Sequence, residues 1–88
     1  MKYVIYAIKD CPYCDKLYDY MIERDMEFAY VMVHNMDKDL QKIKDAHNWS
    51  TVPIVFEGGE FDGDEKFIGG CSDTIALLEK RRLKENPP

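Results

Sequence analysis

The sequence has no long hydrophobic run and no excess of basic residues. Its apolar stretches are only a few residues long, whereas a membrane-spanning helix needs about 20, so we expect no membrane segment. The 17 acidic residues outnumber the 12 basic ones, which leaves a net charge of −5. Nucleic acids are bound by clustered cations, and the one basic cluster, residues 80–84, is typical of a solvated helix end. We therefore expect neither a membrane nor a nucleic-acid partner.

Cysteine is also scarce, with three residues in the chain. Cys11 and Cys14 are too close in sequence for a disulfide between them to hold distant parts of a fold together. The first residues, 1–8, do not resemble a secretory signal. A disulfide framework of the secreted kind is therefore not expected, and the sequence predicts a cytoplasmic protein. The roles that remain possible for the cysteines are metal binding, redox chemistry or burial as apolar thiols.

The 88 residues are enough for one domain, residues 1–88. Alternating or continuous apolar runs predict strands at 2–8, 28–33, 53–56 and 65–68. Amphipathic stretches predict helices at 12–24, from a cap at Asp37 or Asp39 to 46, and from a cap at Ser72 or Asp73 onward. The resulting order, β-α-β-α-β-β-α, belongs to the α/β class. Its first two strands should run parallel, joined by the helix, and its last two should form an antiparallel hairpin.

The sequence Cys11-Pro12-Tyr13-Cys14 falls where the first strand ends and the first helix begins. The first turn of a helix has unpaired N–H groups and carries a partial positive charge, and both stabilise a thiolate. Lys9 adds to this effect, whereas the two neighbouring aspartates oppose it. Cys14 lies one turn further in, where it should be more buried. This asymmetry predicts that Cys11 attacks and Cys14 resolves.

A zinc site is the competing interpretation of a C-x-x-C pair. It would need two further ligands from Cys71, His34 and His47, and the sequence has no second C-x-x-C and no H-x-x-x-H. We therefore predict no metal ligand. The two histidines are expected at the surface, and Cys71 is expected to pack as a small buried residue.

Three motifs together carry a resemblance to a known family: Cys11-Pro12-Tyr13-Cys14, Thr51-Val52-Pro53 and Gly69-Gly70-Cys71-Ser72-Asp73. In this order and at these separations, the sequence resembles the dithiol glutaredoxins over nearly its whole length. The resemblance implies a thioredoxin-like fold, with a four-stranded mixed sheet flanked by three helices. It also implies a glutathione-dependent thiol–disulfide oxidoreductase.

The resemblance further implies a glutathione-binding site. In it, Pro53 would be a cis-proline, the Val52 backbone would pair with the glutathione cysteine, and Ser72 and Asp73 would bind the γ-glutamyl end. The matching positions are Lys9, Tyr13, Thr51, Val52, Pro53, Gly70, Cys71, Ser72 and Asp73. Trp49, just before the second motif, is expected either to wall the groove or to cap the core.

Some positions depart from the family pattern. Ile8 stands where the family has a lysine, so Lys9 is the candidate for the glycyl carboxylate, and Gln41 is a candidate partner for it on the second helix. The segment 57–67 is longer than the usual hairpin.

The resemblance implies glutathione as reductant and co-substrate, without a tightly bound cofactor, and a monomer. Its substrates would be disulfide-containing or glutathionylated proteins, ribonucleotide reductase among them. Two alternatives remain open. One is a hydrogen donor reduced by thioredoxin reductase, against which Ser72 and Asp73 argue. The other is an iron–sulfur module held by Cys11 and glutathione, against which Pro12 argues.

Overall fold

The computed structural model describes residues 2–58 and 65–85. They form a four-stranded sheet in the order β2-β1-β3-β4. The strands are β1 (Tyr3–Ala7), β2 (Phe28–Met32), β3 (Ile54–Glu57) and β4 (Lys66–Gly69). β1 runs parallel to β2, with Tyr3 opposite Phe28, and antiparallel to β3, which pairs antiparallel with β4. The predicted order and the mixed sheet are confirmed. The long hairpin segment falls largely on residues 59–64, outside the described residues.

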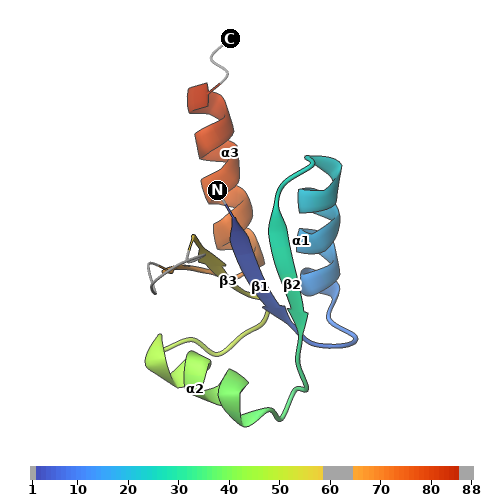
Figure 1. Ribbon diagram of the computed structural model, residues 1–88, viewed down its shortest axis with the longest axis vertical. Helices are drawn as coiled ribbons and strands as arrows, with labels where there is room; N and C mark the ends of the chain where they lie inside the picture. Colours follow the sequence, from blue (N-terminus) through green and yellow to red (C-terminus); the bar gives the residue numbers. More distant parts are fainter. Residues whose placement is uncertain (1, 59–64, 86–88) are drawn as a thin grey trace.

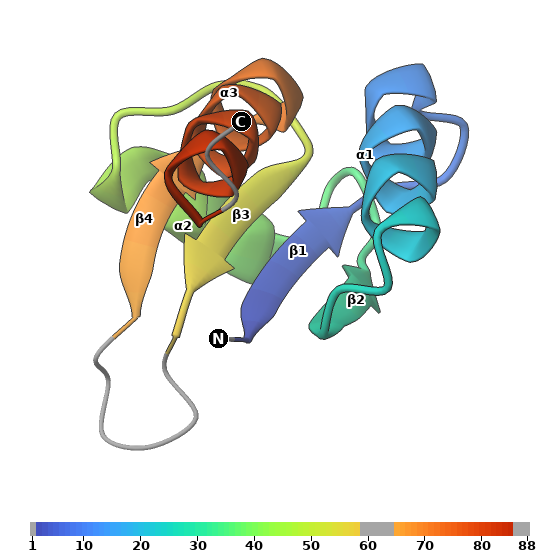
Figure 2. The same cartoon turned by 90° about the horizontal axis from the view of Figure 1, so that it is seen from above.

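Three helices accompany the sheet: α1 (Pro12–Glu23), α2 (Lys38–Ala46) and α3 (Cys71–Glu85). Alternate residues of β1 divide between two cores, as the two-residue period of a strand requires. Tyr3 and Ile5 pack with α1 and α3, whereas Val4 and Tyr6 belong to the cluster around Leu40 of α2. Figure 1 shows α2 beyond the carboxyl ends of β1 and β2, and Figure 2 shows α1 and α3 above the strands. In the described ranges no helix is long and apolar enough to cross a membrane.

The start of α2 agrees with one of the two predicted caps. The Asp37 carboxylate accepts hydrogen bonds from the N–H groups of Asp39 and Leu40, at 2.8 and 3.2 Å. Such a side chain satisfies donors that have no partner within the helix. Asp37, and not Asp39, is therefore the cap.

The start of α3 corrects the prediction that Ser72 or Asp73 caps it. The helix already begins at Cys71, and Asp73 Oδ2 accepts a hydrogen bond from the N–H of Gly70 at 3.1 Å. A carboxylate at the third helical position can reach back to the residue before the helix, so Asp73 secures the helix start from inside. Gly69 makes the preceding turn with a φ of 136°, and a Cβ there would lie 2.7 Å from Asp73 Oδ2. Only glycine fits this turn.

One residue of the basic cluster near the C-terminus, Arg81, departs from the prediction of a solvated helix end, whereas Lys80 and Arg82 are exposed. Arg81 donates hydrogen bonds to both oxygens of Glu57, one of them at 2.9 Å, and to the Tyr3 hydroxyl at 3.0 Å. Glu57 is buried, with 7% of its surface exposed. A buried carboxylate requires such a partner, so Arg81 connects α3 to β3 and β1.

Candidate active site

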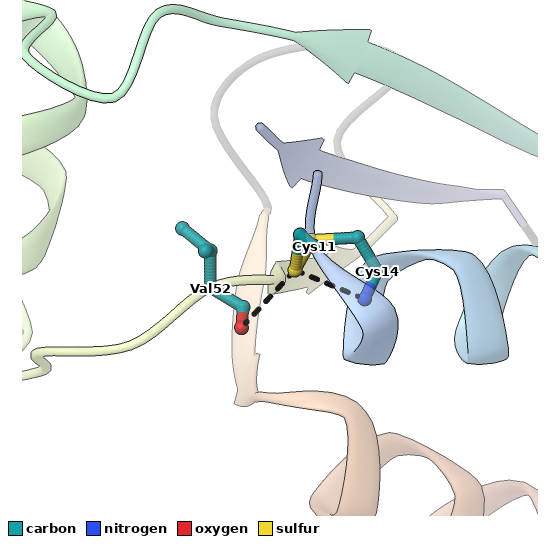
Figure 3. Close-up of a disulfide and its surroundings, with 3 residues drawn as sticks. All are labelled: Cys11, Cys14 and Val52. Carbon is teal, nitrogen blue, oxygen red and sulfur yellow. Dashed lines mark hydrogen bonds between the residues drawn. A yellow bond between two sulfur atoms is a disulfide. The ribbon is translucent and has the colours of Figure 1, made fainter. Parts of the chain in front are cut away.

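Cys11 stands at the junction of strand and helix that the sequence indicates. A turn follows β1, with Asp10 at a φ of 58°, and Cys11 is the N-cap of α1, with Pro12 as the first helical residue. The N–H of Cys14 donates a hydrogen bond to Cys11 Sγ at 3.1 Å (Figure 3). A helix-terminal N–H directed at the sulfur stabilises negative charge on it. The geometry is therefore the one that a reactive thiolate requires.

Cys11 and Cys14 form a disulfide, with their Cα atoms 5.2 Å apart. Cys11 retains 7% of its surface exposed, and Cys14 retains none. Both pack with Ala7, and Ile8, Tyr30 and Val52 flank this cluster. Because an incoming sulfur must reach the atom that it attacks, the more exposed Cys11 is the accessible end of the pair.

The loop before β3 lies directly against the disulfide. The Val52 carbonyl oxygen is 3.9 Å from Cys11 Sγ (Figure 3). The Val52–Pro53 peptide bond is cis, as the resemblance implies. Thr51 is exposed and Pro53 is buried. A backbone carbonyl therefore stands beside the reactive sulfur.

A groove of about 190 Å³ extends from this point to the start of α3. Residues from three separate parts of the sequence come together along it. They are Tyr13, Trp49, Thr51, Val52, Pro53, Gly70, Cys71, Ser72 and Asp73. The structure thus gathers every predicted glutathione residue except Lys9. Trp49 also lines the groove and packs with the cluster around Leu40, so both of its predicted positions, at the groove and against the core, are found.

Lys9 lies elsewhere. It is exposed in the turn after β1 and lines a second depression, of about 390 Å³, together with Ile8, Met32, Val33, His34 and Asn35. Gln41, its suggested partner, donates a hydrogen bond to Asp45 on the surface of α2 at 3.0 Å. Both depressions adjoin the cysteine cluster, because Val52 of the first and Ile8 of the second pack against it.

The third cysteine behaves as a buried thiol. Cys71 is 5% exposed and packs in the main core while it also borders the groove. Burial raises the pKa of its thiol, and Lys16 opposes this rise. A raised pKa keeps a thiol protonated and unreactive at neutral pH. Cys71 therefore borders the groove but is not suited to act as a nucleophile in it.

The histidines stand apart from the cysteines. His34 accepts a hydrogen bond from the N–H of Met36 at 3.2 Å, and His47 stacks on Phe67 with ring centroids 4.5 Å apart. Both are exposed, as predicted. In the part of the chain that the structure describes, no three His, Cys, Asp or Glu side chains are grouped as metal ligands.

The comparisons with known proteins agree with this geometry. A glutaredoxin family model matches residues 3–61. Glutaredoxin-1 of Oryctolagus cuniculus is 33% identical, over 96% of this chain and 83% of its own, and Glutaredoxin 1 of Rickettsia conorii is 30% identical, over 97% and 82%. Among solved structures, a dithiolic glutaredoxin of Trypanosoma brucei brucei superposes with a TM-score of 0.71 at 30% identity, over 94% of this chain and 82% of that one. A glutaredoxin of Brucella melitensis, at 23% identity, shares the fold with a TM-score of 0.71, over 97% and 86%.

Those structures share a thioredoxin-like fold, and this chain pairs two cysteines at the head of α1. The chain therefore belongs to the glutaredoxin family, and it is a thiol–disulfide oxidoreductase with a redox-active Cys11–Cys14 pair.

Proposed function

We propose that this protein uses glutathione to reduce protein disulfides and glutathione mixed disulfides through Cys11. The observation that supports this most directly is the groove itself. It begins at Tyr13 and Val52 beside the disulfide and ends at Ser72 and Asp73. If the cysteine sulfur of glutathione contacts Cys11, the γ-glutamyl part of the tripeptide can therefore lie along this groove.

The groove offers a chemical partner for the cysteine backbone of glutathione and for the carboxylate and ammonium groups of its γ-glutamyl part. The Val52 backbone can pair with the backbone of the ligand cysteine, as an added strand would. The 15-residue helix α3 presents its N-terminus, which favours a carboxylate, and the Ser72 hydroxyl is exposed beside it. Asp73 uses Oδ2 to hold Gly70, and its charge suits the γ-glutamyl ammonium group.

The reaction with a glutathionylated protein takes two exchanges. The Cys11 thiolate attacks the glutathione sulfur, so a Cys11–glutathione disulfide forms and the protein leaves as a thiolate that takes up a proton. A second glutathione thiolate then attacks the glutathione sulfur of that mixed disulfide. Oxidised glutathione forms, and the Cys11 thiolate returns.

A protein disulfide requires the second cysteine. Cys11 attacks one substrate sulfur, and the Cys14 thiolate then attacks Cys11 Sγ, which releases the reduced substrate and leaves the Cys11–Cys14 disulfide. Two glutathione molecules reduce this disulfide to the dithiol. The short distance between the cysteines supports these roles.

The remaining predictions concern the glycyl contact, the protein substrate, the oligomeric state and the location in the cell. Lys9 is proposed to bind the glycyl carboxylate from the depression that it lines. Ribonucleotide reductase as one substrate, a monomeric state and a cytoplasmic location are proposed on the family resemblance and the composition alone.

The deciding experiment compares two sources of electrons. A glutathionylated peptide or an insulin disulfide is offered to the protein with either glutathione, glutathione reductase and NADPH, or thioredoxin reductase and NADPH. We expect NADPH oxidation to depend on this protein only in the first mixture. Turnover only with thioredoxin reductase would contradict glutathione dependence and favour the hydrogen-donor alternative.

A further inference from the structure

Trp49 occupies a position between the core and the groove. Its backbone N–H donates to the Lys44 carbonyl at 2.8 Å, which fixes it to the end of α2. Its ring meets Phe67 edge to face, with centroids 5.4 Å apart, and packs with the cluster around Leu40. The same side chain lines the groove. Trp49 is therefore held from behind by the core while it faces the space in which a ligand would lie.

The indole nitrogen of Trp49 has no hydrogen-bond partner. Among the described side chains, those of residues 2–58 and 65–82, it is the one buried nitrogen or oxygen left unpaired. A buried donor without an acceptor is energetically disfavoured, and such groups are rare enough in folded proteins to need a cause. The position of this donor at a groove wall suggests that its acceptor arrives with the ligand.

The backbone around Gly70 indicates which part of the ligand would supply that acceptor. A Cβ built at Gly70 would lie 3.5 Å from Trp49 Cζ2, which is two bonds from the indole nitrogen, and 3.5 Å from the Pro53 carbonyl oxygen. The nitrogen-bearing edge of the ring therefore lies at the start of α3. The absent side chain of Gly70 leaves space beside that edge for the ring to shift or for a ligand atom to enter.

We propose that Trp49 is a specificity-determining residue whose indole N–H donates to an oxygen of the γ-glutamyl part of the substrate. The proposal rests on the proposed function. It adds a contact from the end of α2 to those from Ser72 and Asp73. The nitrogen is covered in the open groove, so the ring must shift slightly to form the bond. Binding then changes the surroundings of the indole.

Replacement of the indole by a benzene ring isolates the hydrogen bond. Trp49→Phe keeps an aromatic ring against Phe67 and removes the donor. We expect its KM for a glutathionylated peptide to rise about 3- to 10-fold, with kcat unchanged because Cys11 is not affected. Tyr18→Phe is the matched control, since Tyr18 lies on α1 against Phe28 and Tyr30, away from the groove, and its KM should equal that of the wild type.

The part of the ligand that is recognised can be tested with truncated substrates. With a γ-glutamylcysteine mixed disulfide the rise in KM for Trp49→Phe should persist. With a cysteinylglycine mixed disulfide, which lacks the γ-glutamyl group, wild type and variant should have the same KM. An equal loss on both substrates would overturn the proposal, because it would show a general disturbance of the groove.

A second measurement does not depend on the variant. Trp49 is the only tryptophan in the chain, so its emission reports on this site alone. S-methylglutathione, which cannot form a disulfide, should change the emission in a saturable way, and S-methylcysteinylglycine should not. Unchanged emission at concentrations where S-methylglutathione inhibits turnover would overturn the proposal. If the wild type itself shows no preference for glutathione, the proposed function fails; if it does and Trp49→Phe matches it, only the role of Trp49 fails.

Discussion

At the scale of single residues, three thiols that are chemically identical in the unfolded chain acquire different reactivities from their surroundings. Cys11 caps a helix and receives the Cys14 N–H, whereas Cys14 is fully buried one turn further along. Cys71 is buried in the main core, where its pKa is raised. Position relative to a helix start and to solvent therefore assigns each sulfur its reactivity.

The two redox cysteines should be separable by substitution. Cys14→Ser should keep activity on glutathionylated substrates, because a second glutathione from solution can resolve the Cys11 mixed disulfide. Reduction of a protein disulfide should fall by at least about tenfold, because dissolved glutathione cannot match the effective concentration of a neighbouring thiol. Mass spectrometry should then detect a trapped mixed disulfide between the variant and its substrate.

Cys11→Ser is the companion variant and should lose both activities, since a serine hydroxyl is not ionised at neutral pH. If Cys11→Ser retained one activity while Cys14→Ser lost both, the two roles would be reversed.

The slow reactivity of Cys71 can be measured without interference from the other two cysteines. In the oxidised protein they are paired, so iodoacetamide can label only Cys71. Because burial raises its pKa, the thiolate fraction at a given pH is smaller than for an ordinary thiol. Labelling should be slower in the native protein than in guanidinium chloride, and its midpoint should lie at higher pH. Native labelling as fast as that of the unfolded chain would refute this assignment.

At the scale of secondary-structure elements, two helix starts build the active site. α1 begins at the disulfide and α3 begins at the far end of the groove. In α3 the same carboxylate, Asp73, both secures the helix start and is proposed to bind the ligand. One side chain therefore contributes both to the stability of α3 and to the proposed binding of the ligand.

Two substitutions at Asp73 should separate these contributions. Asp73→Asn keeps an oxygen that can accept from Gly70, so the free energy of unfolding should change little. Asp73→Ala removes the acceptor and should lower that free energy by about 1 kcal/mol. Both variants lose the charge, and KM for a glutathionylated substrate should rise about tenfold in each, as expected for loss of a charge-assisted contact of about 1.4 kcal/mol.

Urea unfolding and steady-state kinetics on the same preparations would test this separation. A wild-type KM in Asp73→Asn would remove the carboxylate from the binding site. A loss of stability in Asp73→Asn as large as that in Asp73→Ala would show that the hydrogen bond to Gly70 is not what stabilises the helix start.

At the scale of the whole molecule, α3 is tied to the sheet by packing and by one partly buried ion pair. Leu78 packs in the core with Tyr3 and Val55, and Arg81 reaches Glu57 and Tyr3. These contacts join three elements that are distant in sequence. They also hold α3 against the strands whose neighbouring loops form the groove.

Removal of this ion pair should affect stability far more than loss of a surface pair. Arg81→Met leaves Glu57 buried without its partner and should lower the free energy of unfolding by about 3 kcal/mol. Arg82→Ala removes an exposed pair with Glu79 and should change the free energy by less than about 0.5 kcal/mol. Guanidinium unfolding midpoints measure both. Equal midpoints for the two variants would show that the Arg81 contact adds no stability.

The sequence alone determined the order of elements, the redox pair and most residues of the groove. The order of elements and the redox pair depend on local signals: the apolar period of each segment, Pro12 at a helix start, and a cap at Asp37 or Asp39. The groove residues were predicted from the resemblance of three short motifs to the glutaredoxins, and the structure places these motifs beside the disulfide and at the start of α3.

Only the tertiary structure decided how distant segments meet. It set Lys9 in a depression apart from the groove, brought Trp49 to the groove wall, and paired Arg81 with Glu57. The start of α3 at Cys71 is, in contrast, a local effect, because the Asp73 carboxylate reaches back three residues to Gly70. The other three placements have no periodic signature in the sequence. Each depends on the packing of helices on the sheet, which determines the direction in which a side chain points and the neighbours that it meets.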